Sequence, residues 1–242
     1  MIEKDAKLTK DEEHDLRAKV GQLLWLAHQS RPDLLFDVTC IAAKIANCTV
    51  SDIISVNKII IKAKSSKMSL KFQNLGKNSD LVVFSDASLG NLPNGGSQGG
   101  YLILLVNNNS GEFSPIWWNS KKIRRVVRST LAAETLAMTE GIDMAIFIAT
   151  LFAEITYGKA KPQVMPITCV TDCKSLMDAV NSQNYVAEKR LRMEISGIKE
   201  LLDSGQVRGL QWLDTKQQLA DCLTKRGASS LGLRATLEAG II

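Results

Sequence analysis

The 242-residue sequence predicts an α/β fold, a mixed sheet with flanking helices that is preceded by a small helical segment. Residues 11–67 place apolar side chains at helical spacing, whereas the sequence after residue 79 alternates apolar and polar positions and is rich in turn residues. Three early strands, a long helix and then alternating strands and helices favour helices packed on a mixed sheet. We therefore expect a helical segment at 1–78 and a second domain at 79–242, joined by the short polar stretch 72–79.

The first segment is expected to hold three helices. The stretch 11–27 puts one apolar stripe on a helix, formed by Leu16, Val20, Leu23, Leu24 and Ala27. A second helix is expected after Pro32. A third, at 55–65, carries lysines on one side and isoleucines on the other.

The second part opens with a buried strand at 81–87, which ends next to a carboxylate, Asp86. A Gly- and Asn-rich loop at 91–100 leads into a strand–turn–strand hairpin at 101–120. A long helix follows, which Ser129 can cap at its start and Gly158 can end.

The C-terminal third alternates strands and helices. A buried strand at 165–172 also stops on an aspartate, Asp172. Two helices, a last strand and a last helix are expected at 175–182, 187–205, 207–214 and 215–227. Asp214 and Gln217 fit a capping box for that last helix, which we favour over a metal-binding role for Asp214.

Composition excludes several classes of site. The two histidines are His14 and His28, so residues 29–242 hold no Ser-His-Asp triad and no His-ligated zinc. Five scattered cysteines without a CxxC indicate free thiols in a reduced, intracellular setting. The longest charge-free apolar run, 144–153, is too short to span a bilayer, so no membrane partner is expected.

Four acids stand out by position. Asp86 and Asp172 end strands, and such ends face the crevice of an α/β sheet. Glu134 lies one turn before Ala137, on the sheet-facing stripe of the long helix, and Asp221 sits among apolar neighbours in "LADCL". Taken alone, Asp86 could cap a turn, Glu134 could pair with a lysine, Asp172 could cap the next helix and Asp221 could lie on the surface. Four acids in one place would repel one another, hard cations would relieve that repulsion, and oxygen ligands suit magnesium.

A basic run precedes the long helix. The segment "KKIRRVVR" holds Lys121, Lys122, Arg124, Arg125 and Arg128, in a chain of net charge +5. This run fits either a solvated face or a surface for a polyanion, whose phosphates it would contact without reading sequence.

The order strand Asp, hairpin, helix Glu, strand Asp and late Asp, together with local motifs, resembles the ribonuclease H domain of copia-type retrotransposon Pol polyproteins. The motifs are "FSDAS", "SQGGYLILL", "WNSKK", "RSTLAAETLA", "VTDCKSL" and "QLADCLTK", which cover about residues 80–226. Upstream, "VGQLLWLAHQSRPDLLFDVTCIAA" resembles the end of the reverse transcriptase of the same family. The resemblance implies a ribonuclease H-like mixed five-stranded sheet, preceded by a connection-like helical segment of the reverse transcriptase.

The resemblance also implies a function, hydrolysis of the RNA strand of RNA–DNA hybrids with two Mg²⁺ ions, for which Mn²⁺ can substitute. Asp86 would bridge the ions, Glu134 and Asp172 would each complete one, and Asp221 would hold one loosely. The implied partners are the hybrid and the upstream reverse transcriptase portion, in a virus-like particle or the nucleus. Oligomeric state is left open.

Two departures from the family pattern bear on activity. The block "SSTEAEY" is "STLAAET" here, and no histidine can assist product release, which puts turnover rather than reaction type in doubt. A non-catalytic nucleic-acid-binding or structural fragment remains an alternative. An integrase-like DNA nuclease ranks last, because its acids have another order and spacing.

Overall fold

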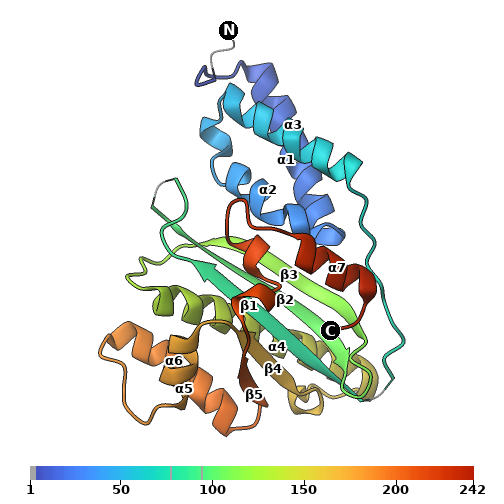
Figure 1. The fold of residues 1–242 in the computed structure, drawn as a ribbon, viewed down its shortest axis with the longest axis vertical. Helices are drawn as coiled ribbons and strands as arrows, with labels where there is room; N and C mark the ends of the chain where they lie inside the picture. Colours follow the sequence, from blue (N-terminus) through green and yellow to red (C-terminus); the bar gives the residue numbers. More distant parts are fainter. Residues whose placement is uncertain (1–3, 77, 94) are drawn as a thin grey trace. The chain divides into compact units, whose positions relative to one another are not determined.

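The computed structural model describes residues 4–76, 78–93 and 95–242 (Figure 1). Its contacts divide the chain into two compact units, Met1–Ser69 and Leu70–Ile242. The division falls earlier than the expected boundary at 78/79. The division lies earlier because residues 70–76 form hydrogen bonds with strands of the second unit. The Gln73 backbone N–H donates to Ser114 Oγ, and Asn107 Nδ2 donates to the Leu75 carbonyl.

The first unit is helical, as expected. It consists of α1 (Lys10–Gln29), α2 (Leu35–Ala42) and α3 (Val50–Ser65), with short 3₁₀ turns η1 (Pro32–Leu34) and η2 (Ile45–Asn47). The predicted stripe of α1 is buried at Leu16, Val20, Leu23 and Ala27. Thr9 and Glu12 form a capping box at its start, which satisfies backbone N–H groups that the helix leaves free.

A buried ion pair holds this unit together. The Arg31 guanidinium binds both carboxylate oxygens of Asp33, with Nε to Oδ1 at 2.7 Å and Nη2 to Oδ2 at 2.8 Å. Arg31 Nη1 also donates to the Ala63 carbonyl, and Lys62 Nζ donates to the Asp33 carbonyl. The "RPD" motif thereby ties the start of α2 to the end of α3.

The second unit is built on a five-stranded mixed sheet. The strands are β1 (Ser79–Ser88), β2 (Ser97–Asn107), β3 (Phe113–Ile123), β4 (Ile167–Thr171) and β5 (Gly209–Trp212), in the order β3-β2-β1-β4-β5. β1 and β2, and β2 and β3, pair antiparallel, whereas β4 runs parallel to both β1 and β5. The predicted mixed five-stranded sheet with flanking helices is confirmed.

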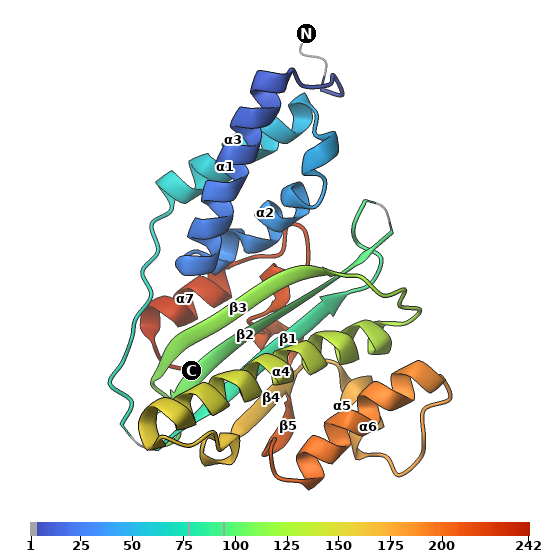
Figure 2. The same cartoon turned by 180° about the vertical axis from the view of Figure 1, so that it is seen from behind.

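Helix α4 (Thr130–Tyr157) lies along one face of this sheet (Figure 2). Ser129 caps it by accepting a hydrogen bond from the Ala132 backbone N–H at 3.1 Å, and Gly158 ends it with a positive φ, both as predicted. At Gly141 the helix approaches β1 so closely that an added Cβ would lie 2.8 Å from Val83 Cγ1. The missing side chain therefore sets the spacing between helix and sheet.

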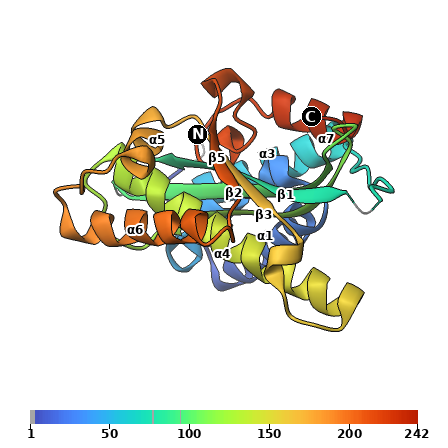
Figure 3. The same cartoon turned by 90° about the horizontal axis from the view of Figure 1, so that it is seen from below.

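The remaining helices of the second unit also flank the sheet. Helices α5 (Lys174–Asn181) and α6 (Lys189–Asp203) confirm the two predicted between β4 and β5. Figure 3 shows α4 and α6 on one side of the sheet and α7 (Leu231–Ala239) on the other. The main core, between the sheet and α4 and α6, is formed by side chains such as Leu81, Ile103, Met138, Ile167 and Ile198.

Helix α4 is long and apolar enough to cross a membrane by length and composition alone, although its charge-free run is short. Its buried residues include Met138, Ile142 and Ala145, and they pack in the sheet core. A core helix that covers a sheet passes the same test, so one such helix is weak evidence for a membrane span.

The last predicted helix, at 215–227, is wrong. The segment forms two 3₁₀ turns, η4 (Thr215–Gln217) and η5 (Asp221–Leu223), and the final α-helix is α7. Gln218 between the turns has an extended backbone, because its side chain donates to the Ser85 carbonyl and accepts from the Ala220 N–H. Asp214 caps η4 by accepting from the Lys216 N–H.

Candidate metal centre

Asp86 lies near the end of the central strand β1, opposite Gly100 of β2, and its side chain is buried. Its Oδ2 accepts a hydrogen bond from the Thr224 hydroxyl, and its Oδ1 accepts one from Lys225 Nζ at 3.2 Å. The last β1 residue, Ser88, donates through Oγ to the Thr224 carbonyl at 2.8 Å. The strand end and the segment after η5 therefore hold each other in place.

Glu134 comes from the first turns of α4 and is only 4% exposed. It lies on the buried stripe that the sequence predicted for this helix. Its Oε2 has no hydrogen-bond partner among the described residues. A buried carboxylate oxygen without a donor is costly, so this atom is a natural ligand for a cation.

Asp172 directly follows β4, the parallel neighbour of β1. Its backbone carbonyl accepts a hydrogen bond from Trp212 Nε1 at 3.0 Å, and the Cys173 N–H beside it donates to Thr171 Oγ1. These contacts fix the turn at the strand end. The side chain is half-buried.

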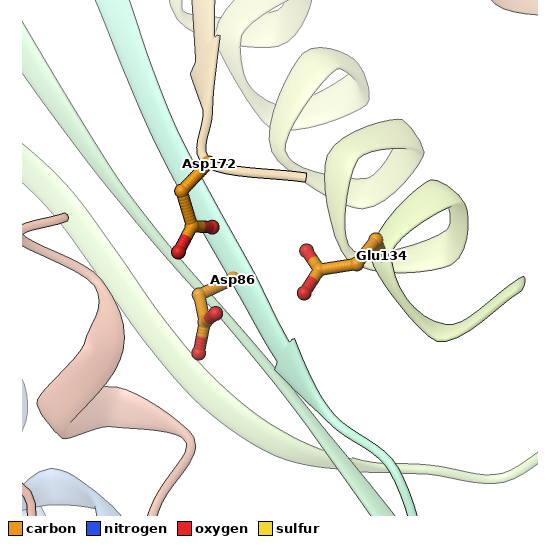
Figure 4. A group of neighbouring side chains, drawn as sticks. All are labelled: Asp86, Glu134 and Asp172. Carbon is orange, nitrogen blue, oxygen red and sulfur yellow. The ribbon is translucent and has the colours of Figure 1, made fainter. Parts of the chain in front are cut away.

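The three carboxylates converge, as Figure 4 shows. One ligand oxygen from each of Asp86, Glu134 and Asp172 lies within 4.8 Å of the others. The adjacent parallel strands β1 and β4 bring the two aspartates together at their C-terminal ends, and α4, which packs on the sheet, supplies the glutamate. An all-oxygen set of this kind suits Mg²⁺ or Mn²⁺, and the orphaned Glu134 oxygen shows that the residues present fit such an ion.

The cluster is electrostatically unfavourable without a cation. Burial, and then the neighbouring charges of Asp86 and Asp172, raise the pKa of Glu134 to about 9. Burial raises the pKa of Asp86 to about 6, although Lys225 and the Thr224 hydroxyl act in the opposite direction. Both upward shifts mean that the ionised forms of these two side chains are disfavoured when no cation is bound.

Asp221 is not a member of this group of three. It begins η5, is half-buried, and its Oδ1 accepts a hydrogen bond from Lys225 Nζ. The same ammonium contacts Asp86, so the fourth predicted acid is joined to the cluster through Lys225. Thr224 and Lys225 were not singled out from the sequence, although a lysine four residues after Asp221 in "ADCLTK" is a signal for such a contact.

The basic run lies at the end of β3 and in the loop before α4, and all five side chains are exposed. Two of the five are paired with acids: Lys121 Nζ lies 2.9 Å from Glu140 Oε2 of α4, and Arg125 binds Glu194 of α6. Lys122, Arg124 and Arg128 form no ion pair within the described part of the chain.

No family model matches the chain. It is 26% identical over 220 residues to the Retrovirus-related Pol polyprotein from transposon RE1 of Arabidopsis thaliana, covering 90% of this chain. It is also 26% identical over 232 residues to the Transposon Ty1-NL2 Gag-Pol polyprotein of Saccharomyces cerevisiae, covering 93% of this chain. The predicted resemblance to retrotransposon Pol polyproteins is confirmed, and the chain spans 12–14% of the length of these relatives.

Among solved structures, the chain is similar to RNase H1 from the halophilic archaeon Halobacterium salinarum NRC-1. The likeness has 17% sequence identity and a TM-score of 0.42, and it covers 60% of this chain and 94% of that protein. At this score the likeness adds nothing to the assignment of the site, which rests on the carboxylates themselves.

Proposed function

We propose that this chain is a metal-dependent endonuclease that hydrolyses the RNA strand of RNA–DNA hybrids, as the ribonuclease H part of a retroelement polyprotein. The observation that carries the proposal is the convergence of Asp86, Glu134 and Asp172 within 4.8 Å. A purely structural or binding fragment gains nothing from three carboxylates gathered at one sheet edge. The similarity to retrotransposon Pol polyproteins supplies the biological setting.

Asp86, Glu134 and Asp172 would hold two divalent cations, with Asp86 shared between them and Asp221 as a weaker, peripheral ligand. Bound Mg²⁺ or Mn²⁺ would polarise the scissile phosphate and favour ionisation of the attacking water. The Thr224 hydroxyl fixes the orientation of the Asp86 carboxylate. Lys121, Lys122, Arg124, Arg125 and Arg128 would contact duplex phosphates, and the RNA 2′-hydroxyl would distinguish RNA from DNA.

The upstream reverse transcriptase portion would be the protein partner of this chain. Residues 1–78 would then be a connection-like segment, and the chain would act inside the cell, in a virus-like particle or the nucleus. The buried Arg31–Asp33 pair agrees with a structural role for this segment.

The proposal is tested with a labelled RNA–DNA hybrid in Mg²⁺, compared with duplex DNA and single-stranded RNA of the same sequence. We expect cleavage of the RNA strand of the hybrid alone, and its loss when chelator removes the metal. Asp86→Asn should reduce cleavage to background while the far-UV circular dichroism stays unchanged, because a neutral amide cannot hold two cations.

Two results would contradict the proposal. Undiminished cleavage by a folded Asp86→Asn protein would remove the cluster from the chemistry. Tight hybrid binding without any cleavage in Mg²⁺ or Mn²⁺ would favour the non-catalytic alternative.

A further inference from the structure

Lys225 places a positive charge inside the candidate metal centre. Its ammonium binds Asp86 Oδ1 at 3.2 Å and also binds Asp221 Oδ1. The lysine side chain is 34% exposed, whereas that of Asp86 is 1% exposed. The Lys225 ammonium therefore contacts two of the four acids from a partly exposed position.

The carboxylates differ in the hydrogen-bond donors that the chain provides for them. Both Asp86 oxygens accept hydrogen bonds, from Thr224 and from Lys225. The Glu134 Oε2 atom, in contrast, is buried and has no partner within the described residues. Asp86 of the cluster and the neighbouring Asp221, here called the Asp86–Asp221 edge, therefore already hold a cation, whereas the side of the cluster around Glu134 does not.

A divalent ion that enters at the Asp86–Asp221 edge would meet the ammonium on the same oxygens. Two cations on one carboxylate edge repel each other, and the repulsion is strong where burial lowers the effective dielectric. Among the described residues the ammonium contacts Asp86 and Asp221 and neither Glu134 nor Asp172, so an ion near those two meets only the weaker, more distant charge of Lys225. The two places for metal should consequently differ in affinity.

We propose that Lys225 is a built-in competitor for divalent metal, which occupies the Asp86–Asp221 edge and is displaced when a second ion binds there. This inference rests on the proposed function for the identity of the metal. It concerns the order in which metal ions bind to the centre, and the hydrolysis reaction itself does not require such an order.

The local structure allows the ammonium to move while the backbone stays. The segment is anchored by Ser88 Oγ on the Thr224 carbonyl, by Ser120 Oγ on the Leu223 carbonyl and by the Gln218 side chain on the Ser85 carbonyl. None of these bonds involves the lysine side chain. Its four-carbon stem is flexible and 34% exposed, so displacement breaks the contacts with Asp86 and Asp221 without moving the backbone.

The test measures metal binding directly, on the full chain without nucleic acid. Mn²⁺ binding is counted by electron paramagnetic resonance of the free ion, and Mg²⁺ binding by calorimetry. We expect the wild-type protein to bind two Mn²⁺ ions with unequal affinity. Lys225→Gln should tighten the weaker ion about fivefold or more, the lower end of typical linkage between two sites.

Matched variants locate the effect. Lys225→Arg, which keeps the charge, should leave the weaker ion weak. Lys19→Gln, which removes an exposed lysine paired with Asp15 on α1, should change neither affinity. Asp86→Asn should weaken both ions, which shows that the measured ions sit at the cluster.

A second readout follows thermal unfolding. Lys225→Gln should lower the melting temperature in chelator, because the acids lose their internal cation, and saturating Mg²⁺ should reduce the difference from wild type. Should the variant fail to fold, wild-type protein labelled with ¹³C-lysine still decides the matter. The Lys225 Cε signal, assigned with Lys225→Arg, should shift only as the second ion binds.

Unchanged or weaker metal binding in folded Lys225→Gln would overturn the proposal, as would a Lys225 signal that does not respond to metal. Failure of the wild-type protein to bind metal at the cluster would overturn it too. A protein that shows the competition but cleaves no hybrid would overturn the proposed function and leave this inference standing.

Discussion

Glu134 is buried by the fold although one of its carboxylate oxygens has no hydrogen-bond donor. The helix start, the buried stripe and the strand ends fix the backbone where this residue is 4% exposed. At neutral pH such a residue costs stability in the metal-free protein, and a bound cation offsets that cost. Function and stability therefore oppose each other at this position.

The metal-free protein should be stabilised by Glu134→Gln. An acid whose folded pKa is raised holds its proton more tightly when folded, so it lowers stability as pH rises from 4.5 to about 9. At pH 8 in chelator we expect the variant's free energy of unfolding to exceed wild type by more than about 1 kcal/mol, since one pKa unit corresponds to about 1.4 kcal/mol.

Urea unfolding across that pH range checks this prediction. The gain should grow from pH 5 to pH 8, and Glu154→Gln, an exposed control on the same helix, should show none. In saturating Mg²⁺ the gain should vanish. If Glu134→Gln and wild type had the same free energy of unfolding at every pH, Glu134 would carry no electrostatic cost.

At the scale of elements, the close approach of η5 to β2 places Thr224 and Lys225 at the cluster. Gly100 makes this approach possible, because a Cβ there would lie 2.7 Å from Leu223 Cβ and 2.9 Å from Thr224 Cγ2. At the neighbouring Gly99 a Cβ would lie 3.4 Å from Ala137 Cβ, which is an ordinary contact. The two glycines of "SQGG" therefore have different roles.

Gly100→Ala should push the η5 segment away from the sheet. We expect a loss of about 1–3 kcal/mol in the free energy of unfolding, typical of overpacking, together with weaker metal binding as Thr224 loses Asp86. Gly99→Ala is the matched control and should affect both far less. Equal losses in the two variants, measured by urea unfolding and calorimetry, would contradict the assigned role of Gly100.

The basic run is divided by its ion pairs, so its residues should contribute unequally to hybrid binding. Changing Lys122, Arg124 and Arg128 together to Ala should reduce the slope of log affinity against log salt by about 1 per lost phosphate contact. Changing Lys121 and Arg125 should reduce it less per residue, because Glu140 and Glu194 already neutralise them.

Fluorescence anisotropy of a labelled hybrid over a salt series measures these slopes. Affinity should fall by a similar factor for hybrids of different sequence, since phosphate contacts carry no base information. An unchanged slope in the triple variant would show that the run is a solvated face.

At the scale of the whole molecule, the chain consists of two units, each with its own buried side chains, of which the second holds the entire candidate centre. The stretch before β1 belongs to the second unit, since Leu75 is 5% exposed and Gln73 exchanges hydrogen bonds with Ser114. A domain with its own core can fold alone.

A fragment of residues 70–242 should thus unfold cooperatively and bind metal as the full chain does. A fragment of residues 79–242, cut at the boundary expected from the sequence, should be less stable by about 1.5–3 kcal/mol, the value of burying one leucine. Thermal unfolding followed by circular dichroism compares them. Equal stability of the two fragments would favour the boundary at 78/79.

The sequence by itself determined the elements of the sheet, the long helix with its Ser129 and Gly158 ends, and the candidate acids Asp86, Glu134 and Asp172. Period, caps and strand-end position are local signals, and each is carried by residues close in the chain. Only the tertiary structure decided the form of residues 215–227 and the surroundings of Asp221. Gln218, Thr224 and Lys225 bind atoms more than a hundred positions away, at Ser85 and Asp86. Those distant hydrogen bonds outweigh the local preference for a helix, because they satisfy buried polar groups that a helix would leave without partners.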